Sequence, residues 1–372
     1  MDEASRTGGW IVFDEGLTGR TIRLSATLRL PSDTTLDGGC RGVTITAAPR
    51  TTILRLSGVE NVVVRGLSFV KEPYSDVGEP TGDAIGLAGR FDRIAILNND
   101  FSRCGDGCVD AISDQPGETM RVLVALNRFS RHNKVMLIGS LVCSGDRRPA
   151  ACAAPLDYLD GAFRPSLRLT LLANLFEETS QRHPKAISGA FVRSVANLIL
   201  LRPTAYGNAT QSALYGAAAA SGGLLLAEGD VVVNPTATER VAAGPVSATR
   251  HRSTMDPEAD GAVLVAGLTL VGPLRAVEHR PGLVRQYAEP GPVGDWVVDP
   301  ITLGACLRRA AGYTALGNDL PVACAILRRL GATGREIVPS GLVPANEVVQ
   351  VAPARLTTDP AGRAEGPTGR YR

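Results

Sequence analysis

Four short segments of this chain repeat one pattern: an alternating apolar run ends in asparagine, and a large apolar residue follows two places later. The segments read IAILNNDF, VLVALNRF, LTLLANLF and VRSVANLI, and VVVRGLSF fits the same frame with Leu67 in the asparagine position. Superposed, they form two columns: Asn99, Asn127, Asn174 and Asn197, and then Phe69, Phe101, Phe129, Phe176 and Ile199. The chain therefore builds one structural unit several times.

Short β-branched strands that recur every 20 to 30 residues or so are typical of stacked parallel coils, which form a solenoid. A buried asparagine at the same turn of every coil can satisfy its amide by bonding to the coils above and below. The alternative is a β-sandwich whose strands end in asparagine, but sandwich turns come about every 8 to 12 residues, which is tighter than this spacing. We therefore expect an all-β solenoid with a small helical C-terminal region.

Three regions follow from the patterns along the chain. Residues 1–286 carry the solenoid signal, with an insertion at about 141–165 between two of the repeats. Residues 287–350 contain two amphipathic patterns, ITLGACLRRAAGY and LPVACAILRRLGA, which predict short helices that cap the end of the stack. Residues 351–372 are rich in proline, glycine, threonine and arginine, and we expect a disordered tail there.

Composition argues against two classes of partner. The formal net charge is only +2 and no long basic run occurs, so we expect no binding of nucleic acid. No apolar stretch approaches the length of a membrane span, so we expect no membrane association. The first residues, MDEASR, lack the apolar segment of a signal peptide.

Seven cysteines bear on the cellular compartment. Three pairs have spacings that could form disulfides: Cys143 with Cys152, Cys306 with Cys324, and Cys104 with Cys108. Cys40 is then left over, and no pair has the C-x-x-C spacing of a zinc site. Disulfides favour an oxidising compartment, so we expect a secreted monomer whose signal peptide is not in this chain. A cytosolic protein with unpaired thiols is the alternative.

Acidic residues recur in phase with the coils. Asp106 and Asp110 lie in CGDGCVD, and Asp83, in TGDAIG, precedes Asp106 by one coil. An extended strand would hold the first two about 13 Å apart, so sharing an ion requires a bend, which Gly105 and Gly107 permit. Oxygen ligands from two adjacent coils suit Ca²⁺ better than zinc. The alternative is that these Gly-Asp pairs are ordinary turn residues.

Basic residues follow in the next two coils. Lys134, in RHNKVMLIGS, lies one coil above Asp106, and Arg182, in TSQRHPKAISG, lies one coil further. The same segments add a positive rim made of Arg128, Arg131, His132, His183 and Lys185. Such a face is either a solvated ion-pair network or a site for a polyanion, and the rim favours an acidic polymer. We expect substrate to be bound by Lys134, Lys185, His132 and His183.

These motifs resemble the pectate lyase family of right-handed parallel β-helix enzymes. The resemblance covers about residues 10–201 and is clearest in WIVFDEG, TTLDG, TGDAIG, GDGCVD, HNKVMLIG and NLFEETSQRHPKAISG. It implies a right-handed parallel β-helix with Ca²⁺ at Asp83, Asp106 and Asp110. It also implies that Lys134 binds substrate and that Arg182 is the catalytic base.

Two positions depart from the family pattern. The arginine that closes the family's Arg-x-Pro-x-x-Arg segment is Ile187 here, so a group that grips a substrate carboxylate is missing. The family's Trp-Ile-Asp-His strand is replaced by residues 95–98, which read AILN. Neither change removes an expected ion ligand or the expected base, but both point to weaker binding or a different substrate.

The reaction that the resemblance implies is Ca²⁺-dependent β-elimination in polygalacturonate, which gives unsaturated oligogalacturonides. Because an arginine side chain normally stays protonated, an arginine base predicts an alkaline optimum. One alternative is an inverting polygalacturonase, but the Asn-Thr-Asp and Gly-His-Gly signatures of that family are absent. The other is a catalytically inactive or altered-specificity β-helix that binds acidic polysaccharide.

Overall fold

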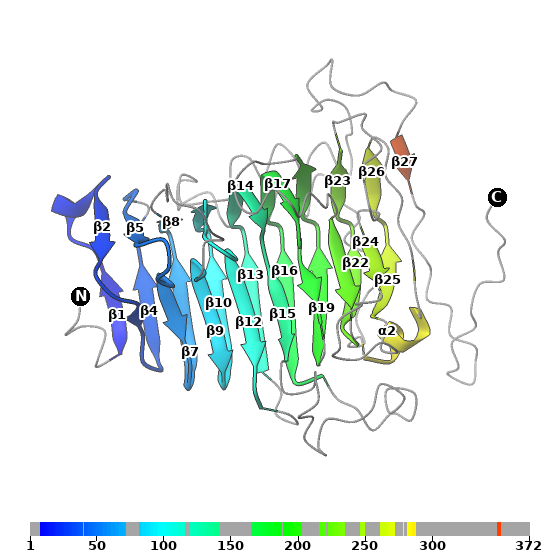
Figure 1. The fold of residues 1–372 in the computed structure, drawn as a ribbon, viewed down its shortest axis with the longest axis horizontal. Helices are drawn as coiled ribbons and strands as arrows, with labels where there is room; N and C mark the ends of the chain where they lie inside the picture. Colours follow the sequence, from blue (N-terminus) through cyan, green and yellow to red (C-terminus); the bar gives the residue numbers. More distant parts are fainter. Residues whose placement is uncertain are drawn as a thin grey trace.

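A computed structural model describes residues 8–39, 41–71, 82–115, 120–140, 165–187, 189–202, 216–220, 222–234, 246–249, 261–271, 278, 281–287 and 348–350. The described residues wind into one spool, and Figure 1 shows each coil lying beside the preceding one along the long axis. No helix in this part of the chain is both long and apolar enough to cross a membrane.

Each coil contributes one strand to each of three sheets. The nine-stranded sheet contains β1 (Gly9–Val12), β4 (Thr34–Asp37), β7 (Val59–Arg65), β10 (Phe91–Leu97), β13 (Met120–Ala125), β16 (Leu167–Leu172), β19 (Ala190–Val195), β22 (Leu224–Glu228) and β25 (Ala262–Ala266). The ten-stranded sheet contains β2 (Thr21–Leu24), β5 (Thr44–Ala47), β8 (Ser68–Val70), β11 (Asp100–Ser102), β14 (Arg128–Lys134), β17 (Leu175–Gln181), β20 (Leu198–Leu201), β23 (Val231–Val233), β26 (Thr269–Val271) and β27 (Val348–Gln350). The eight-stranded sheet contains β3 (Leu28–Arg29), β6 (Leu54–Leu56), β9 (Ile85–Gly89), β12 (Val109–Ser113), β15 (Leu137–Ser140), β18 (Lys185–Ala186), β21 (Ala217–Ala220) and β24 (Val246–Thr249).

Strands β1 to β26 pair in parallel, each with the strands three places away in sequence, for example β10 with β7 and β13. Only adjacent coils of a wound chain can pair in this order, so the all-β parallel β-helix expected from the repeat is confirmed. The one 3-10 helix described, η1 (Glu15–Leu17), begins after Asp14, whose side chain accepts a hydrogen bond from Gly16 N.

The asparagine column forms a continuous buried ladder. Asn127 Oδ1 accepts from Asn99 N at 2.9 Å, and Asn127 Nδ2 donates to Asn174 Oδ1 at 3.1 Å. Asn174 and Asn197 repeat the same contacts one coil further on. At the start of the ladder Leu67 N donates to Asn99 Oδ1 at 3.1 Å, so the leucine in this column closes the series with its backbone. The ladder satisfies amides that are fully buried in every coil.

A second regularity of the same turn concerns the residue before each ladder position. These residues all have positive φ values between 50° and 67°: Gly66, Asn98, Leu126, Ala173 and Ala196. Left-handed backbone is uncommon for leucine and alanine. The hydrogen bonds of the ladder hold the turn in this conformation at every coil.

The aromatic column fills the interior beside the ladder. The rings of Phe69, Phe101, Phe129 and Phe176 stack in succession with centroids 4.9 to 5.2 Å apart. All four side chains are fully buried. The spacing of the rings matches the separation of neighbouring strands, about 4.8 Å, so one ring per coil packs without a gap.

Breaking the ladder is expected to destabilise the fold. Leucine at position 127 would keep the volume of asparagine roughly but leave Asn99 N without its acceptor and Ile96 O without its donor. Each buried unsatisfied group costs about 1 to 3 kcal/mol, so we expect Asn127→Leu to lower the free energy of unfolding by about 3 kcal/mol or more. Urea titration measures this value, and a loss below about 0.5 kcal/mol, typical of surface changes, would contradict the role of the ladder.

The ladder continues into a residue that the repeat did not reveal. Asp230 Oδ1 accepts from Asn197 N at 2.8 Å and from Asn197 Nδ2 at 2.9 Å, and Asp230 Oδ2 accepts from Ser194 Oγ. Burial raises the pKa of Asp230 to about 6, although these three donors oppose the shift. The column therefore carries a carboxyl group in a position otherwise occupied by amides.

This aspartate makes stability depend on pH. A folded pKa of about 6 lies above the reference value of 3.8, so its contribution is full below pH 3.8 and is lost as pH rises through 6. The shift corresponds to about 3 kcal/mol. We expect Asp230→Asn to match the wild type at pH 4 and to exceed it by about that amount at pH 8. Urea titrations at both pH values test this, and equal stabilities at pH 8 would contradict it.

The C-terminal part of the described chain covers the last coils from outside. Helix α2 (Pro281–Tyr287) places Val284 in an apolar cluster with Phe191, Leu224 and Leu264 on the outer face of the nine-stranded sheet. Strand β27 pairs antiparallel with β26 and extends the ten-stranded sheet (Figure 1). The two predicted capping helices and the predicted tail lie outside the described residues, so the boundaries at residues 286 and 350 stay predictions.

Candidate active site

The sequence-predicted site residues lie at one corner of the coil, where the ten-stranded sheet turns into the eight-stranded sheet. Asp106 follows β11, Lys134 ends β14 and Arg182 follows β17, so three successive coils each present one of them. Backbone bonds join these turns: Asp106 N donates to Gly82 O at 3.1 Å, and Met136 N donates to Arg182 O at 3.0 Å. The corner is therefore a continuous wall built from one turn per coil.

A disulfide between Cys104 and Cys108 closes the loop that carries Asp106, which confirms that this pair can form. The two Cα atoms lie 4.8 Å apart, so the loop doubles back where an extended strand would span about 13 Å. Gly105 has a φ of 102°, a conformation that favours glycine. The loop that carries Asp106 is thus bent. The other two predicted disulfides and Cys40 lie outside the described residues.

The loop brings the second and third carboxylates toward the first. Gly107 N donates to Asp83 Oδ1 at 3.1 Å, which ties the loop to the coil before it. A Cβ atom added to Gly107 would lie 2.4 Å from Asp110 Oδ1, so only glycine lets the Asp110 side chain fold back here. The same Asp110 oxygen accepts from Leu137 N at 2.8 Å, in the next coil.

Both inner carboxyl groups resist ionisation. The pKa of Asp83 is raised to about 6, mainly by burial; the hydrogen bond from Gly107 lowers it and the negative charge of Asp106 raises it. Burial also raises the pKa of Asp110 well above its usual value, with a further contribution from Asp83, while the charge of Arg182 acts in the opposite direction. The mutual effects show that the three carboxylates form one negative cluster, which a cation would stabilise in ionised form.

The donor set fits a hard cation. Asp83, Asp106 and Asp110 offer carboxylate oxygens, and such ligands suit Ca²⁺. The three aspartates, here called the cradle, are not a compact ligand set; among the described residues, that set is Cys104, Cys108 and His132.

Lys134 points to the cradle. Its Nζ lies 3.5 Å from Asp106 Oδ1, and its side chain is 11% exposed where that of Asp106 is 46% exposed. A mostly buried ammonium beside a half-exposed carboxylate leaves the positive charge fixed in place. Asp106 and Lys134 therefore lie in adjacent coils, as predicted, and their side chains are in contact.

Arg182 lies one coil beyond Lys134 in a left-handed conformation, with a φ of 63°. That backbone geometry is uncommon for arginine and turns the chain sharply between β17 and β18. His183 N donates to Gly216 O at 3.2 Å, which fastens the turn to the following coil. The peptide bond between His183 and Pro184 is cis. The Arg182 side chain is half-buried and close enough to Asp110 to affect its titration.

Two of the expected substrate-binding residues lie beneath the surface. His132 is 1% exposed, its Nε2 lies 3.0 Å from Asp106 O, and burial lowers its pKa to about 4. His183 is fully buried between Thr179 Oγ1, 2.8 Å from its Nε2, and the edge of the Phe176 ring. These positions correct the expectation of a rim that includes both histidines. Each supports the wall from inside, because a buried neutral imidazole cannot contact a polymer in solvent.

The remaining rim residues differ in their surroundings. Lys185 begins β18, and burial together with the charge of Arg182 lowers its pKa to about 8, so it lies near the expected base. Arg128 is paired with Glu177 at 2.9 Å on the outer face of the ten-stranded sheet, and Arg131 is exposed in the same strand. Of the rim, Lys185 is therefore the cation that joins Lys134 and Arg182 at the corner.

Two cations near the cradle were missed in the sequence. Lys71 is 1% exposed, and its Nζ donates to Pro49 O at 3.1 Å and to Thr51 O. Burial lowers its pKa to about 8, while Asp83 acts in the opposite direction. Arg55 pairs in register with Gly86 and also interacts favourably with Asp83. Neither residue lies in a recurring motif. Only its sequence separation from Asp83, read as a position along the coil, could have predicted that it lies near the site.

Known proteins with similar sequences are named as pectate lyases. No protein-family model matches the chain. Probable pectate lyase P59 of Solanum lycopersicum is 31% identical over 144 residues, which cover 35% of this chain and 30% of that protein. Probable pectate lyase 8 of Arabidopsis thaliana is 33% identical over 143 residues, which cover 35% of this chain and 32% of that protein. The match thus spans about a third of the length of these relatives.

Solved structures extend the likeness of the fold to most of the chain. The major cedar pollen allergen jun a 1 is 19% identical with a TM-score of 0.50, covering 84% of this chain and 82% of the allergen. A polygalacturonate lyase fused to a self-assembling amphipathic peptide is 14% identical with a TM-score of 0.51, covering 78% and 70%. Together with the local sequence identity, this shared parallel β-helix confirms the resemblance of the chain to the pectate lyase family.

Proposed function

We propose that this protein is a pectate lyase-like polysaccharide lyase that cleaves polygalacturonate by Ca²⁺-dependent β-elimination and gives unsaturated oligogalacturonides. The observation that carries the proposal is the corner itself. Asp83, Asp106 and Asp110 form a negative cluster there, and Lys134 and Arg182 follow in the next two coils. The names of the sequence relatives agree with this chemistry.

Asp83, Asp106 and Asp110 would hold the Ca²⁺ ion. When bound, the ion would neutralise the uronate carboxylate and so make the proton on carbon 5 more acidic. The Lys134 ammonium lies 3.5 Å from Asp106. It would therefore place a fixed positive charge beside a uronate carboxylate bound at the same ion. Arg182 takes the proton from carbon 5 as the glycosidic oxygen leaves carbon 4. Lys185 adds a second positive charge near Arg182, since the charge of Arg182 contributes to the lowered pKa of Lys185.

A second candidate is a β-helix that binds acidic polysaccharide without cleaving it, or that acts on another uronate polymer. Ile187 favours this reading, because an apolar side chain stands where the family pattern has a carboxylate-binding arginine. Its Cγ1 would lie 2.2 Å from a Cβ atom on Gly139, so the isoleucine lies directly over the neighbouring coil. The corner therefore offers one cationic contact fewer to a substrate than the family pattern does.

One assay separates the two functions. The protein is incubated with polygalacturonate, methyl-esterified pectin and alginate, each with Ca²⁺ and with a chelator, and ultraviolet absorption of unsaturated ends is followed. The proposed function predicts absorption on polygalacturonate, present with Ca²⁺ and absent with chelator, whereas absorption on alginate alone would favour the second candidate. Retention of the protein on immobilised polygalacturonate with no absorption on any polymer would establish the binding protein instead.

A further inference from the structure

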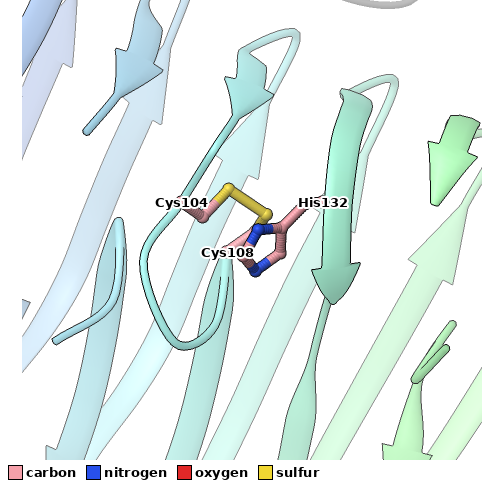
Figure 2. A group of neighbouring side chains, drawn as sticks. All are labelled: Cys104, Cys108 and His132. Atoms are coloured by element: carbon pink, nitrogen blue, oxygen red, sulfur yellow. A yellow bond between two sulfur atoms is a disulfide. The ribbon is translucent and has the colours of Figure 1, made fainter. Parts of the chain in front are cut away.

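One compact group of metal-ligating side chains in the described chain takes no part in the proposed reaction. Cys104, Cys108 and His132 are each almost fully buried, and their ligand atoms all lie within 4.8 Å of one another. Figure 2 shows the two sulfur atoms joined as a disulfide, with one ring nitrogen of His132 turned toward them. His132 comes from β14, one coil beyond the loop that carries the cysteines.

One contact of His132 indicates which ring nitrogen could bind a metal. Its Nε2 lies 3.0 Å from Asp106 O. A carbonyl oxygen can only accept, so Nε2 carries the proton and Nδ1 carries the lone pair of the neutral ring. Metal-binding histidines commonly donate their second ring nitrogen to a backbone carbonyl in this way. His132 thus already has the tautomer and the outer contact of a metal ligand.

We propose that reduction of the Cys104–Cys108 disulfide creates a Cys₂His site for one thiophilic divalent cation such as Zn²⁺. Either a dithiol supplies two electrons and two protons and becomes a disulfide, or a phosphine supplies the electrons and water the protons, with phosphine oxide as the product. The sulfur–sulfur bond is replaced by two thiols. Binding of the cation then releases both thiol protons to solvent, and the ligands are two thiolates and His132 Nδ1. The disulfide and the metal are alternative ways to fasten the same loop.

The two sites of this corner differ in chemistry. Thiolate and imidazole ligands select zinc-like cations, and the carboxylates of Asp83, Asp106 and Asp110 select hard cations. The first site could not be predicted from the sequence, because Cys-x₃-Cys lacks the usual zinc spacing and the third ligand belongs to another coil. The inference does not depend on lyase activity.

Cobalt reports on such a site directly. The background protein carries C40S, C143S, C152S, C306S and C324S, so that Cys104 and Cys108 are its only cysteines. It is reduced with a phosphine under nitrogen, and Co²⁺ is added in the presence of excess Ca²⁺, which occupies oxygen ligands. We expect a thiolate-to-cobalt absorption band that saturates at one equivalent and disappears when Zn²⁺ is added. The oxidised background protein should show no band.

Single substitutions assign the ligands. Cys104→Ser and Cys108→Ser should each remove the saturable band, and His132→Asn should weaken binding at least about tenfold. Circular dichroism of the reduced protein is recorded in parallel. The inference is overturned if the reduced background protein binds no more Co²⁺ than the oxidised one. It is also overturned if either serine variant keeps the band, or if reduction alone unfolds the coils.

Discussion

Replacing Arg182 by lysine is expected to lower the rate of unsaturated-product formation on polygalacturonate about 10³-fold. A positioned general base contributes about 10²- to 10⁴-fold to a proton transfer. Lysine keeps the positive charge but is shorter, so its amine falls short of the position that the left-handed turn at Arg182 gives to the guanidinium. Because Met136 N and the flanking strands hold the backbone of this turn, stability should change little.

The matched control for this variant is Arg128→Lys. Arg128 lies in β14 on the outer face of the ten-stranded sheet, where it pairs with Glu177, and it has no role in the proposed reaction. Its variant should keep the wild-type rate. A turnover of Arg182→Lys within about tenfold of the control would remove Arg182 from the role of base. A wild-type optimum below neutral pH would do the same, because an arginine base requires alkaline conditions.

Asp110→Asn is expected to change activity and stability in opposite directions. Asparagine can still accept from Leu137 N, so the local hydrogen bond survives. Removing one of three carboxylates weakens the cation site, and we expect product formation to fall at least about 10²-fold. In chelator, the variant should unfold at a higher temperature than the wild type. Burial and the neighbouring Asp83 raise the pKa of Asp110, which means that its charge is unfavourable when no cation is present.

Thermal unfolding with and without Ca²⁺ measures both parts of this prediction. A ligand that binds only the folded state raises the unfolding temperature, so wild type should respond to Ca²⁺ and Asp110→Asn should not. Asp114→Asn is the control, because Asp114 is exposed just beyond the same strand and accepts a hydrogen bond from Gln115 Nε2. A Ca²⁺ response in Asp110→Asn equal to that of the control would show that the ion binds elsewhere.

Much of the fold follows from one repeated turn. Asn99 and its successors predicted both the stacking of coils and the hydrogen bonds between them, and the phenylalanine column predicted the interior. The repeat did not identify Asp230 as a member of the ladder, because the position is not an asparagine. Its carboxyl group nevertheless accepts the same hydrogen bonds as an amide oxygen. The left-handed residues before the ladder were also missed, since Leu126 and Ala173 carry no sequence signal for that conformation.

The sequence predicted which coils carry the site residues, but it did not predict which of their side chains are buried. The repeat spacing predicted that Asp106, Lys134 and Arg182 lie at one corner, because strands in parallel register stack equivalent turns above one another. Phase says nothing about whether a side chain points in or out at a turn. His132 and His183 therefore looked like surface residues, yet both lie in the wall.

A crystal structure of the Arg182→Lys variant with Ca²⁺ and an oligogalacturonate tests the proposed site most directly, because the substitution should leave substrate intact. We predict an ion bound by Asp83, Asp106 and Asp110, with a uronate carboxylate on the same ion and carbon 5 of that sugar facing residue 182. An ion or an oligosaccharide bound away from this corner, with the three aspartates unliganded, would contradict the proposed function.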